Sequence, residues 1–217
     1  MGCERPGTLL CDECRGELAR IDVQTACPAC GAPFGEVLCT QCPKLRPEGG
    51  YAFSGARAFG SLEGTLARLV VVYKDSGERR LADELASLML EACGSDWRAW
   101  AEVVCFVPAS PEAYARRGFD HMERVASAFA RSARLPLADV LYRASSLDQR
   151  ALGLEGRAAN ASGAFEVEPC RARLVAGRRV LLLDDVFTTG ATLQAAASAL
   201  RDAGCCDIRV LVAARVW

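Results

Sequence analysis

One stretch near the C-terminal end, VLLLDDVFTTGAT at residues 180–192, limits most strongly what this chain can fold into. Its first four residues are apolar, as in a strand that is buried on both faces of a parallel sheet. Asp184 and Asp185 end the strand, and the apolar face of residues 193–203, followed by Gly204, predicts a helix. The stretch therefore predicts a strand–loop–helix unit of an α/β fold.

The loop of this unit favours a phosphate ligand. Its residues are small or have a hydroxyl group: Thr188, Thr189, Gly190, Ala191 and Thr192. A glycine lets the backbone approach an anion, and the free N–H groups and the dipole at the start of a helix attract one. The adjacent carboxylates lie where ligands gather in such sheets, and they could accept ribose hydroxyls or hold Mg²⁺. The combination suits a sugar phosphate.

A plainer interpretation of the same stretch is a buried strand followed by a helix cap, with no ligand. We favour the ligand site, because two adjacent acids before TTGAT exceed what a cap requires. The pattern GxxxxGK[ST] is absent, so the stretch does not predict an ordinary site for nucleotide triphosphates.

Length and composition exclude several other classes of protein. The 217 residues suffice for one domain and a small second one, and 51% of them are hydrophobic, enough for a substantial core. The formal charge of −1 provides no long-range attraction for nucleic acid. No apolar run reaches the roughly 18 residues of a membrane span, and the N-terminus lacks the regions of a signal peptide. We therefore expect a cytoplasmic protein without a membrane span.

The N-terminal segment predicts a metal site. The chain has 12 cysteines, which in a reducing compartment indicate metal binding or free thiols rather than disulfides. Cys27 and Cys30 form one CxxC pair, and Cys39 and Cys42 form a second pair after eight intervening residues. Two such pairs can direct four thiolates at one tetrahedral ion, which favours structural Zn²⁺. The alternative is four unpaired thiols, but that gives no reason for the spacing.

An imperfect copy of this pattern comes first, with Cys3, Cys11 and Cys14. It lacks a fourth cysteine. Three thiolates can hold Zn²⁺ together with water or another ligand, so a three-cysteine zinc site is one interpretation. The other interpretations are a remnant that holds no metal and a chain whose true start lies upstream.

A turn-rich segment over residues 43–50 separates two parts of the chain. We predict a small cysteine-rich domain over residues 1–48 and a larger domain over residues 49–217. Apolar periodicity predicts strands over residues 51–59, 103–107, 140–142, 165–167 and 208–214, and helices over residues 17–22, 62–73, 81–93 and 119–133.

Several charged residues beside these elements each have two interpretations. Lys74 ends a predicted helix, where it would either meet the helix dipole or contact a diphosphate. Arg116 and Arg117 precede a glycine, and they would either hold a diphosphate in a forked manner or lie in a solvated turn. His121 is the only histidine, and a packing or surface role is more common for such a residue than proton transfer.

Two loops are further candidates. Residues 108–111, PASP, follow the strand predicted over residues 103–107, where a second ligand loop is expected. Residues 145–162 are polar and without clear periodicity, which fits either a lid over the site or a solvated surface helix.

The stretch LLLDDVFTTGATL closely resembles the motif with which type I phosphoribosyltransferases bind phosphoribosyl diphosphate (PRPP). The order of CPACGAPF, LARLVVVYKDSGE, FVPAS, RRGFDH and LLLDDVFTTGATL, over nearly the full chain, is similar to that in the ComF family of competence-associated phosphoribosyltransferase-like proteins. This resemblance implies a type I phosphoribosyltransferase-like α/β fold, a mostly parallel sheet flanked by helices. It also implies an N-terminal zinc-ribbon-like domain, typically a double zinc ribbon.

The resemblance also implies roles for individual residues. Asp184 and Asp185 would be the catalytic acids and would hold the ribose hydroxyls of PRPP, directly or through Mg²⁺. Residues 188–192 would hold the 5-phosphate. Lys74, Ala109 and Ser110 are candidates for the diphosphate side.

This chain departs from the ComF pattern at two points. The family usually has Asn-Gln where this chain has Asp120 and His121, so a new acid stands near the expected phosphate contacts. The first cysteine of the first CxxC pair is also missing.

Three functions follow from the resemblance. The first is an enzyme that transfers phosphoribose to a base-like acceptor, a glycosyltransferase reaction with pentosyl transfer. The second is a sensor that binds PRPP without turnover. The third is an adaptor for single-stranded DNA or competence proteins during DNA uptake, acting through the zinc domain. The sequence leaves turnover, the acceptor and the oligomeric state open.

Overall fold

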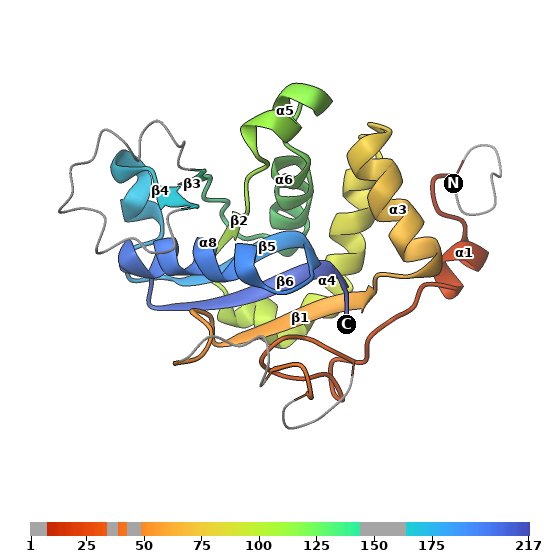
Figure 1. The fold of residues 1–217 in the computed structure, drawn as a ribbon, viewed down its shortest axis with the longest axis horizontal. Coiled ribbons are helices and arrows are strands. Elements are labelled where there is room, and N and C mark those ends of the chain that lie inside the picture. The colour runs from red at the N-terminus through yellow and green to blue at the C-terminus, as the bar shows by residue number, and fades with distance from the viewer. Residues whose placement is uncertain (1–7, 34–38, 43–48, 144–163) are drawn as a thin grey trace.

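The computed structural model of the chain describes residues 8–33, 39–42, 49–143 and 164–217. Its larger sheet has four parallel strands in the order β1-β6-β5-β2 (Figure 1). Their bounds are Gly55–Ser61 for β1, Asp207–Arg215 for β6, Arg179–Phe187 for β5 and Val103–Phe106 for β2. The mostly parallel sheet predicted from the sequence is confirmed.

The two central strands, β5 and β6, are buried on both faces because their apolar side chains alternate between two layers. One set packs into the core on the first face: Leu181, Leu183, Leu211 and Ala213. The other set packs on the second face: Val180, Leu182, Val210 and Val212. The apolar run of residues 180–183 is thus buried on both faces of the sheet, as the sequence predicts.

Three helices cover the first face of the sheet: α3 (Gly64–Asp75), α4 (Leu81–Trp100) and α6 (His121–Ala133). The helix predicted over residues 81–93 is longer in the structure and continues past Gly94, which has a non-helical φ of 66°. The continuation is stabilised because Trp97 is buried against the core and Arg57 forms an ion pair with Asp96.

Helix α8 (Ala191–Asp202) lies on the second face, with the four cysteines at positions 27, 30, 39 and 42 in the same core cluster (Figure 1). A small antiparallel sheet pairs β3 (Leu141–Tyr142) with β4 (Glu166–Val167), and the 3₁₀ helix η1 (Pro169–Leu174) follows. Helix α5 (Pro111–Arg117) was not predicted. Its start is a Ser110 cap and a proline at the first turn, a combination that favours helix initiation.

The helix predicted over residues 17–22 is wrong. The helix of this segment is α1 (Asp12–Gly16), and residues 19–21 run along the outer side of β1 instead. Arg20 forms an antiparallel bridge with Gly60, and Ile21 N–H donates to Phe59 O at 2.9 Å. The strand offers backbone partners that outweigh the weak apolar pattern of such a short segment.

Some predictions fall outside the described residues. Cys3, most of the segment 43–50 and the proposed lid over 145–162 are among them, so these remain predictions, as does the division at residue 48. Within the part of the chain that the structure describes, no helix is both long and apolar enough to cross a membrane.

Candidate functional site

The candidate site lies at the C-terminal end of β5, where Asp184 and Asp185 are nearly buried, with exposed fractions of 8% and 6%. Asp184 is still paired in the sheet, in register with Val212 of β6. Both carboxyl groups therefore sit on a rigid strand, near the point where the chain leaves the sheet after Phe187. Two acids this close and this buried do not both ionise freely.

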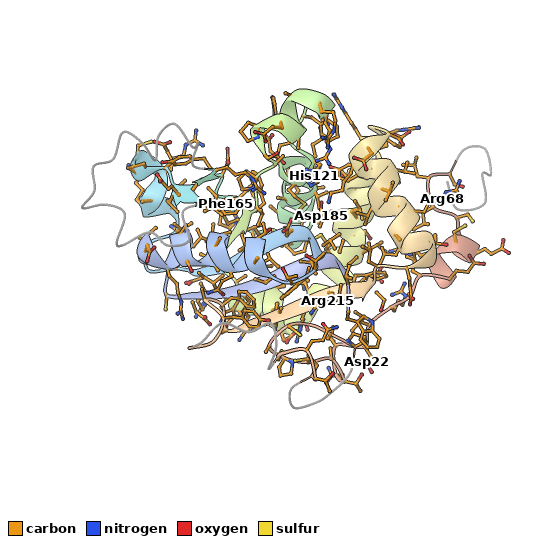
Figure 2. All side chains as sticks on the ribbon, viewed as in Figure 1. Asp22, Arg68, His121, Phe165, Asp185 and Arg215 are labelled. Atoms are coloured by element: carbon orange, nitrogen blue, oxygen red, sulfur yellow. The ribbon has the colours of Figure 1, made fainter. Side chains whose placement is uncertain are left out.

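Asp185 holds two cationic or polar side chains from other elements. Its Oδ2 atom lies 2.6 Å from Nε2 of His121, at the start of α6, and 2.6 Å from Nζ of Lys74, at the end of α3. Figure 2 shows His121 beside Asp185 above the central strands. Burial alone would raise the pKa of Asp185, but the hydrogen bond from His121 and the charge of Lys74 outweigh it and lower the pKa to about 2.

Asp184 has the opposite electrostatic environment. Burial, and then the negative charge of Asp185, raise its pKa well above the ordinary value. Its Oδ1 atom accepts a hydrogen bond from the backbone N–H of Asp185 at 2.9 Å. The pair thus combines one ionised carboxylate with one carboxyl that tends to keep its proton, a set that can both accept and donate hydrogen bonds.

Arg117 extends this network. Its Nη1 donates to Nδ1 of His121 at 3.3 Å, and its Nη2 donates to Oδ1 of Asp75 at 3.4 Å. Because arginine only donates, Nδ1 of His121 is the acceptor and Nε2 is the nitrogen that donates to Asp185. The side chain of Arg117 is only 11% exposed. Arg117 is therefore part of the site, and the interpretation as a solvated turn residue does not fit it.

A pocket of about 390 Å³ opens beside this network. Lys74, Ser76, Arg116 and Arg117 are among its lining residues. The lining has three cationic side chains against one acid, Asp75, so the pocket suits an anion.

The β5–α8 loop has the backbone geometry that the sequence predicts. Gly190 has φ 85°, and a Cβ atom there would lie 2.6 Å from a ring carbon of Phe187. Thr188, Thr189, Ala191 and Thr192 are exposed, so their side chains do not fill the core. The loop thus leaves the N-terminal end of α8 accessible.

The loop between β2 and α5 is tied by its own hydrogen bonds. Ala109 N–H donates to Oδ2 of Asp120 at 2.7 Å, and the Ser110 hydroxyl accepts from Ala113 N–H at 3.2 Å. Oδ1 of Asp120 caps α6 by accepting from the N–H groups of Met122 and Glu123. Asp120 therefore fixes the position of this loop relative to α6.

The four cysteines 27, 30, 39 and 42 form a compact, buried group whose Sγ atoms all lie within 4.8 Å of one another. Neighbouring Sγ atoms are 3.4 Å apart for Cys30 and Cys39, 3.6 Å for Cys39 and Cys42, and 3.7 Å for Cys27 and Cys42. A tetrahedral zinc site with Zn–S bonds of about 2.3 Å requires sulfur separations near 3.8 Å. The group could therefore hold zinc, and it fits a zinc ribbon.

Backbone donors support an anionic sulfur at Cys27, whereas burial raises the pKa of the Cys30 and Cys42 thiols. Burial raises the pKa of the Cys27 thiol, but N–H groups, first that of Cys39, outweigh burial and lower the pKa to about 7. Hydrogen bonds of this kind stabilise a metal-bound thiolate.

Two comparisons show what this chain is similar to. Residues 114–216 match the family model described as phosphoribosyl transferase domain. Over 206 residues, the chain is 29% identical to the competence protein ComFC of Streptococcus pneumoniae (strain ATCC BAA-255 / R6), a match that covers 92% of this chain and 84% of that protein. These matches support the ComF family assignment.

Two solved structures align over part of the chain. The structure of the allosteric regulatory enzyme of purine biosynthesis aligns with a TM-score of 0.44 and 19% identity, over 60% of this chain and 25% of that one. Orotate phosphoribosyltransferase from Aeropyrum pernix aligns with a TM-score of 0.41 and 19% identity, over 65% of this chain and 75% of that one. The chain thus spans about a quarter of the length of the first protein.

The two residues that depart from the ComF pattern both have defined positions. Asp120 bonds to the Ala109 backbone, and His121 is buried and bonds to Asp185. Sequence reasoning favoured a packing or surface role for His121 and did not connect it with Asp185. The signal that could have revealed the connection is its place where ComF proteins usually have an amide side chain.

The first cysteine group of the ComF pattern is only partly described. Cys11 immediately precedes α1 and Cys14 lies within it, buried, whereas Cys3 falls outside the described residues. Among the residues that the structure describes, cysteines 27, 30, 39 and 42 are the one group that brings three or more potential ligands together. A zinc site at Cys3, Cys11 and Cys14 remains a prediction.

Proposed function

We propose that this ComF protein binds PRPP with Mg²⁺ at the C-terminal end of β5 and transfers its phosphoribosyl group. One observation supports the proposal above the others. Two adjacent buried carboxyl groups, Asp184 and Asp185, lie on the strand whose following loop leads to an accessible helix N-terminus with a left-handed glycine as its cap. A sugar with a terminal phosphate offers hydroxyl groups for the acids and an anion for the helix N-terminus.

The loop residues 188–192 would bind the 5-phosphate. The backbone N–H groups at the start of α8 donate to phosphate oxygens, and the threonine hydroxyls add further donors. A side chain at Gly190 would clash with Phe187, so the loop keeps this conformation only with glycine at this position.

Asp184 and Asp185 would bind the ribose hydroxyls or the Mg²⁺ ion that accompanies PRPP. Carboxylate oxygens are the ligands that Mg²⁺ prefers, so the donor set fits the ion. When bound, Mg²⁺ would offset the charge that develops on the departing diphosphate. A cation beside Asp184 would also favour loss of the proton that burial and Asp185 hold there.

Lys74, with Arg116 and Arg117, would attract the diphosphate end. These side chains line the pocket next to Asp185, and their charge complements a diphosphate. The Ala109 N–H and the Ser110 hydroxyl already have partners inside the protein, so we expect Ala109 and Ser110 to shape the diphosphate side rather than supply its main donors.

In the proposed reaction, the C1–O bond of PRPP breaks and its electron pair leaves with the diphosphate. A nucleophilic atom of the acceptor then bonds to C1, and the sugar is oxocarbenium-like in between, as in glycoside cleavage. The protein forms no covalent bond to the sugar. Its residues would act by orientation and by stabilising charge.

We further propose that cysteines 27, 30, 39 and 42 hold a structural Zn²⁺ ion, and that the chain acts in competence, the process named for its ComFC relative. Two rival functions remain: a PRPP sensor without turnover, and an adaptor for single-stranded DNA or competence proteins. Residues 1–50 contain seven acids and five lysines or arginines, so charge gives the DNA adaptor no support.

Calorimetry with PRPP and MgCl₂, followed by a diphosphate-release screen over candidate acceptors, tests the proposal. We expect binding by the natural protein and a loss of about 100-fold or more in affinity for Asp185→Asn, because a charged ligand group is removed. Asp202→Asn is the control, because Asp202 is exposed and lies at the end of α8 that is opposite to the loop. No PRPP binding would contradict the proposal, whereas binding without diphosphate release would favour the sensor.

A further inference from the structure

Arg215, the last residue of β6, is a charged side chain in the core, with an exposed fraction of only 1%. Its guanidinium group contacts the ring of Phe187, with Cζ 4.4 Å from the ring centroid. Figure 2 shows Arg215 between the sheet and the N-terminal segment, apart from the contact of His121 with Asp185. A residue this buried and this charged requires a structural reason.

One side of the guanidinium group holds the beginning of the β5–α8 loop. Nη1 donates to the carbonyl oxygen of Phe187 at 3.0 Å and to that of Thr188 at 2.7 Å, and it also contacts the carbonyl oxygen of Val216. Thr188 is the first residue of the segment that we propose binds the 5-phosphate. Arg215 thus fixes the direction in which the chain enters that segment.

The other side of the same group holds both CxxC pairs. Nε donates to the carbonyl oxygen of Cys30 at 3.1 Å, and Nη2 donates to Oε1 of Gln41 at 3.2 Å. Cys30 belongs to the first pair, and Gln41 lies between the two cysteines of the second pair. A single side chain therefore connects the four-cysteine centre with the loop.

Charge gives a second reason to connect them. Between the described residues, the oxygen atoms for which Arg215 has a stated hydrogen bond are neutral carbonyl or amide oxygens. A buried cation gains from a negative charge nearby. Four thiolates around one Zn²⁺ ion form a dianion. Arg215 contacts the backbone of Cys30, one of the four ligands, so such a centre would place negative charge close to the guanidinium group.

We infer that Arg215 is a positioning residue that makes the conformation of the 188–192 loop depend on the metal at the four-cysteine centre. The metal holds the two CxxC pairs together, the pairs hold the guanidinium group, and that group holds the carbonyl oxygens of Phe187 and Thr188. The effect of this coupling on the affinity for a phosphate ligand rests on the proposed function. Because coupling between sites is reciprocal, a bound phosphate ligand should also slow the loss of zinc.

Hydrogen exchange of the full-length protein tests the coupling without any phosphate ligand. We expect amides in peptides over residues 187–193 to exchange about tenfold faster after zinc is removed with a chelator. In Arg215→Met, which keeps the bulk but loses the donors, the same amides should exchange fast while zinc is still bound. Arg209→Met is the matched control, since Arg209 also belongs to β6 but stacks on Trp97 and Trp100.

Gln41→Ala provides a test if Arg215→Met fails to fold, because it removes one contact to the CxxC pairs and keeps the guanidinium group. It should accelerate exchange in the loop by a smaller factor than zinc removal does. Slow loop exchange in the zinc-free natural protein would overturn the inference. Equal acceleration over α4 and α6 would overturn it as well, because that would indicate general loss of stability.

Calorimetry with PRPP and MgCl₂ on the same proteins separates the inference from the proposed function. With zinc bound, we expect Arg215→Met to bind PRPP about tenfold more weakly than Arg209→Met. If the natural protein binds no PRPP but its loop still responds to zinc, the proposed function fails and the coupling stands. If PRPP binds equally to Arg215→Met and Arg209→Met, the coupling is refuted and the proposed function stands.

Discussion

Nε2 of His121 lies 2.6 Å from Oδ2 of Asp185, and Nζ of Lys74 lies equally close to the same oxygen. One carboxylate oxygen thus has donors from two helices on the same face of the sheet. A ribose hydroxyl or a Mg²⁺ ion that binds Asp185 must use its other oxygen or replace one of these donors. The interaction keeps Asp185 ionised, and it links ligand binding to the ends of α3 and α6.

Replacing His121 tests how much this contact matters. We expect His121→Gln to keep a donor for Asp185 and to leave PRPP affinity within about threefold of the natural protein. His121→Ala leaves Asp185 with Lys74 as its remaining side-chain donor among the contacts described here, and it should lower the free energy of unfolding by about 1–3 kcal/mol. Denaturant titration and calorimetry measure the two effects. Equal behaviour of both variants would show that the hydrogen bond is unimportant.

Gly190→Ala should disturb the phosphate loop in two ways. The φ of 85° is unfavourable for alanine, and the new Cβ atom would meet the Phe187 ring at 2.6 Å. We expect a loss of about 2–3 kcal/mol in the free energy of unfolding. Gly204→Ala is the control, because Gly204 has the same φ of 85° and open space around it. Its cost should be only about 1 kcal/mol, and a cost equal to that of Gly190→Ala would remove the steric argument.

Metal analysis should find about one zinc ion per chain, since one complete four-cysteine centre is present in the described residues. Cys39→Ser should abolish this zinc, and it should lower the midpoint of thermal unfolding because metal binding stabilises the folded state. Cys205→Ser is the control, as Cys205 lies outside the group. Two zinc ions per chain would show that the group of Cys3, Cys11 and Cys14 also binds metal.

Asp120→Asn separates the two tasks of this side chain. Asparagine is a good helix cap, so the start of α6 should persist, but one of the two oxygen acceptors is lost. We expect the Ala109 amide to exchange about fivefold to tenfold faster, as measured by hydrogen exchange. Asp120→Ala should also loosen the amides of Met122 and Glu123. No change at Ala109 in either variant would mean that the hydrogen bond from Ala109 does not stabilise the loop.

The β5–α8 unit could be predicted from the sequence because its signals are local. An apolar run, two acids, a glycine and an amphipathic segment follow one another directly, and each has a direct structural meaning. The two CxxC pairs are predictable for the same reason, because the ligand spacing is a property of the chain itself.

The partners of Asp185 could not be predicted in this way. Lys74 and His121 come from two different helices, and only the packing of α3 and α6 on one face of the sheet brings them to the end of β5. The sequence leaves two roles open for Arg117, because no local pattern distinguishes a turn residue from a side chain directed at a histidine. The helix over residues 17–22 was wrong for a related reason, since a strand distant in sequence determines the conformation of that segment.

The contact of residues 19–21 with β1 has a practical consequence. β1 is the outermost strand on its side of the sheet, and Arg20 and its neighbours occupy part of its free hydrogen-bonding edge. A shortened protein that begins near residue 49 would leave that edge bare and ready to pair with another copy. Low solubility of such a truncation would then report an uncovered strand, and would say nothing against the catalytic competence of the remaining domain.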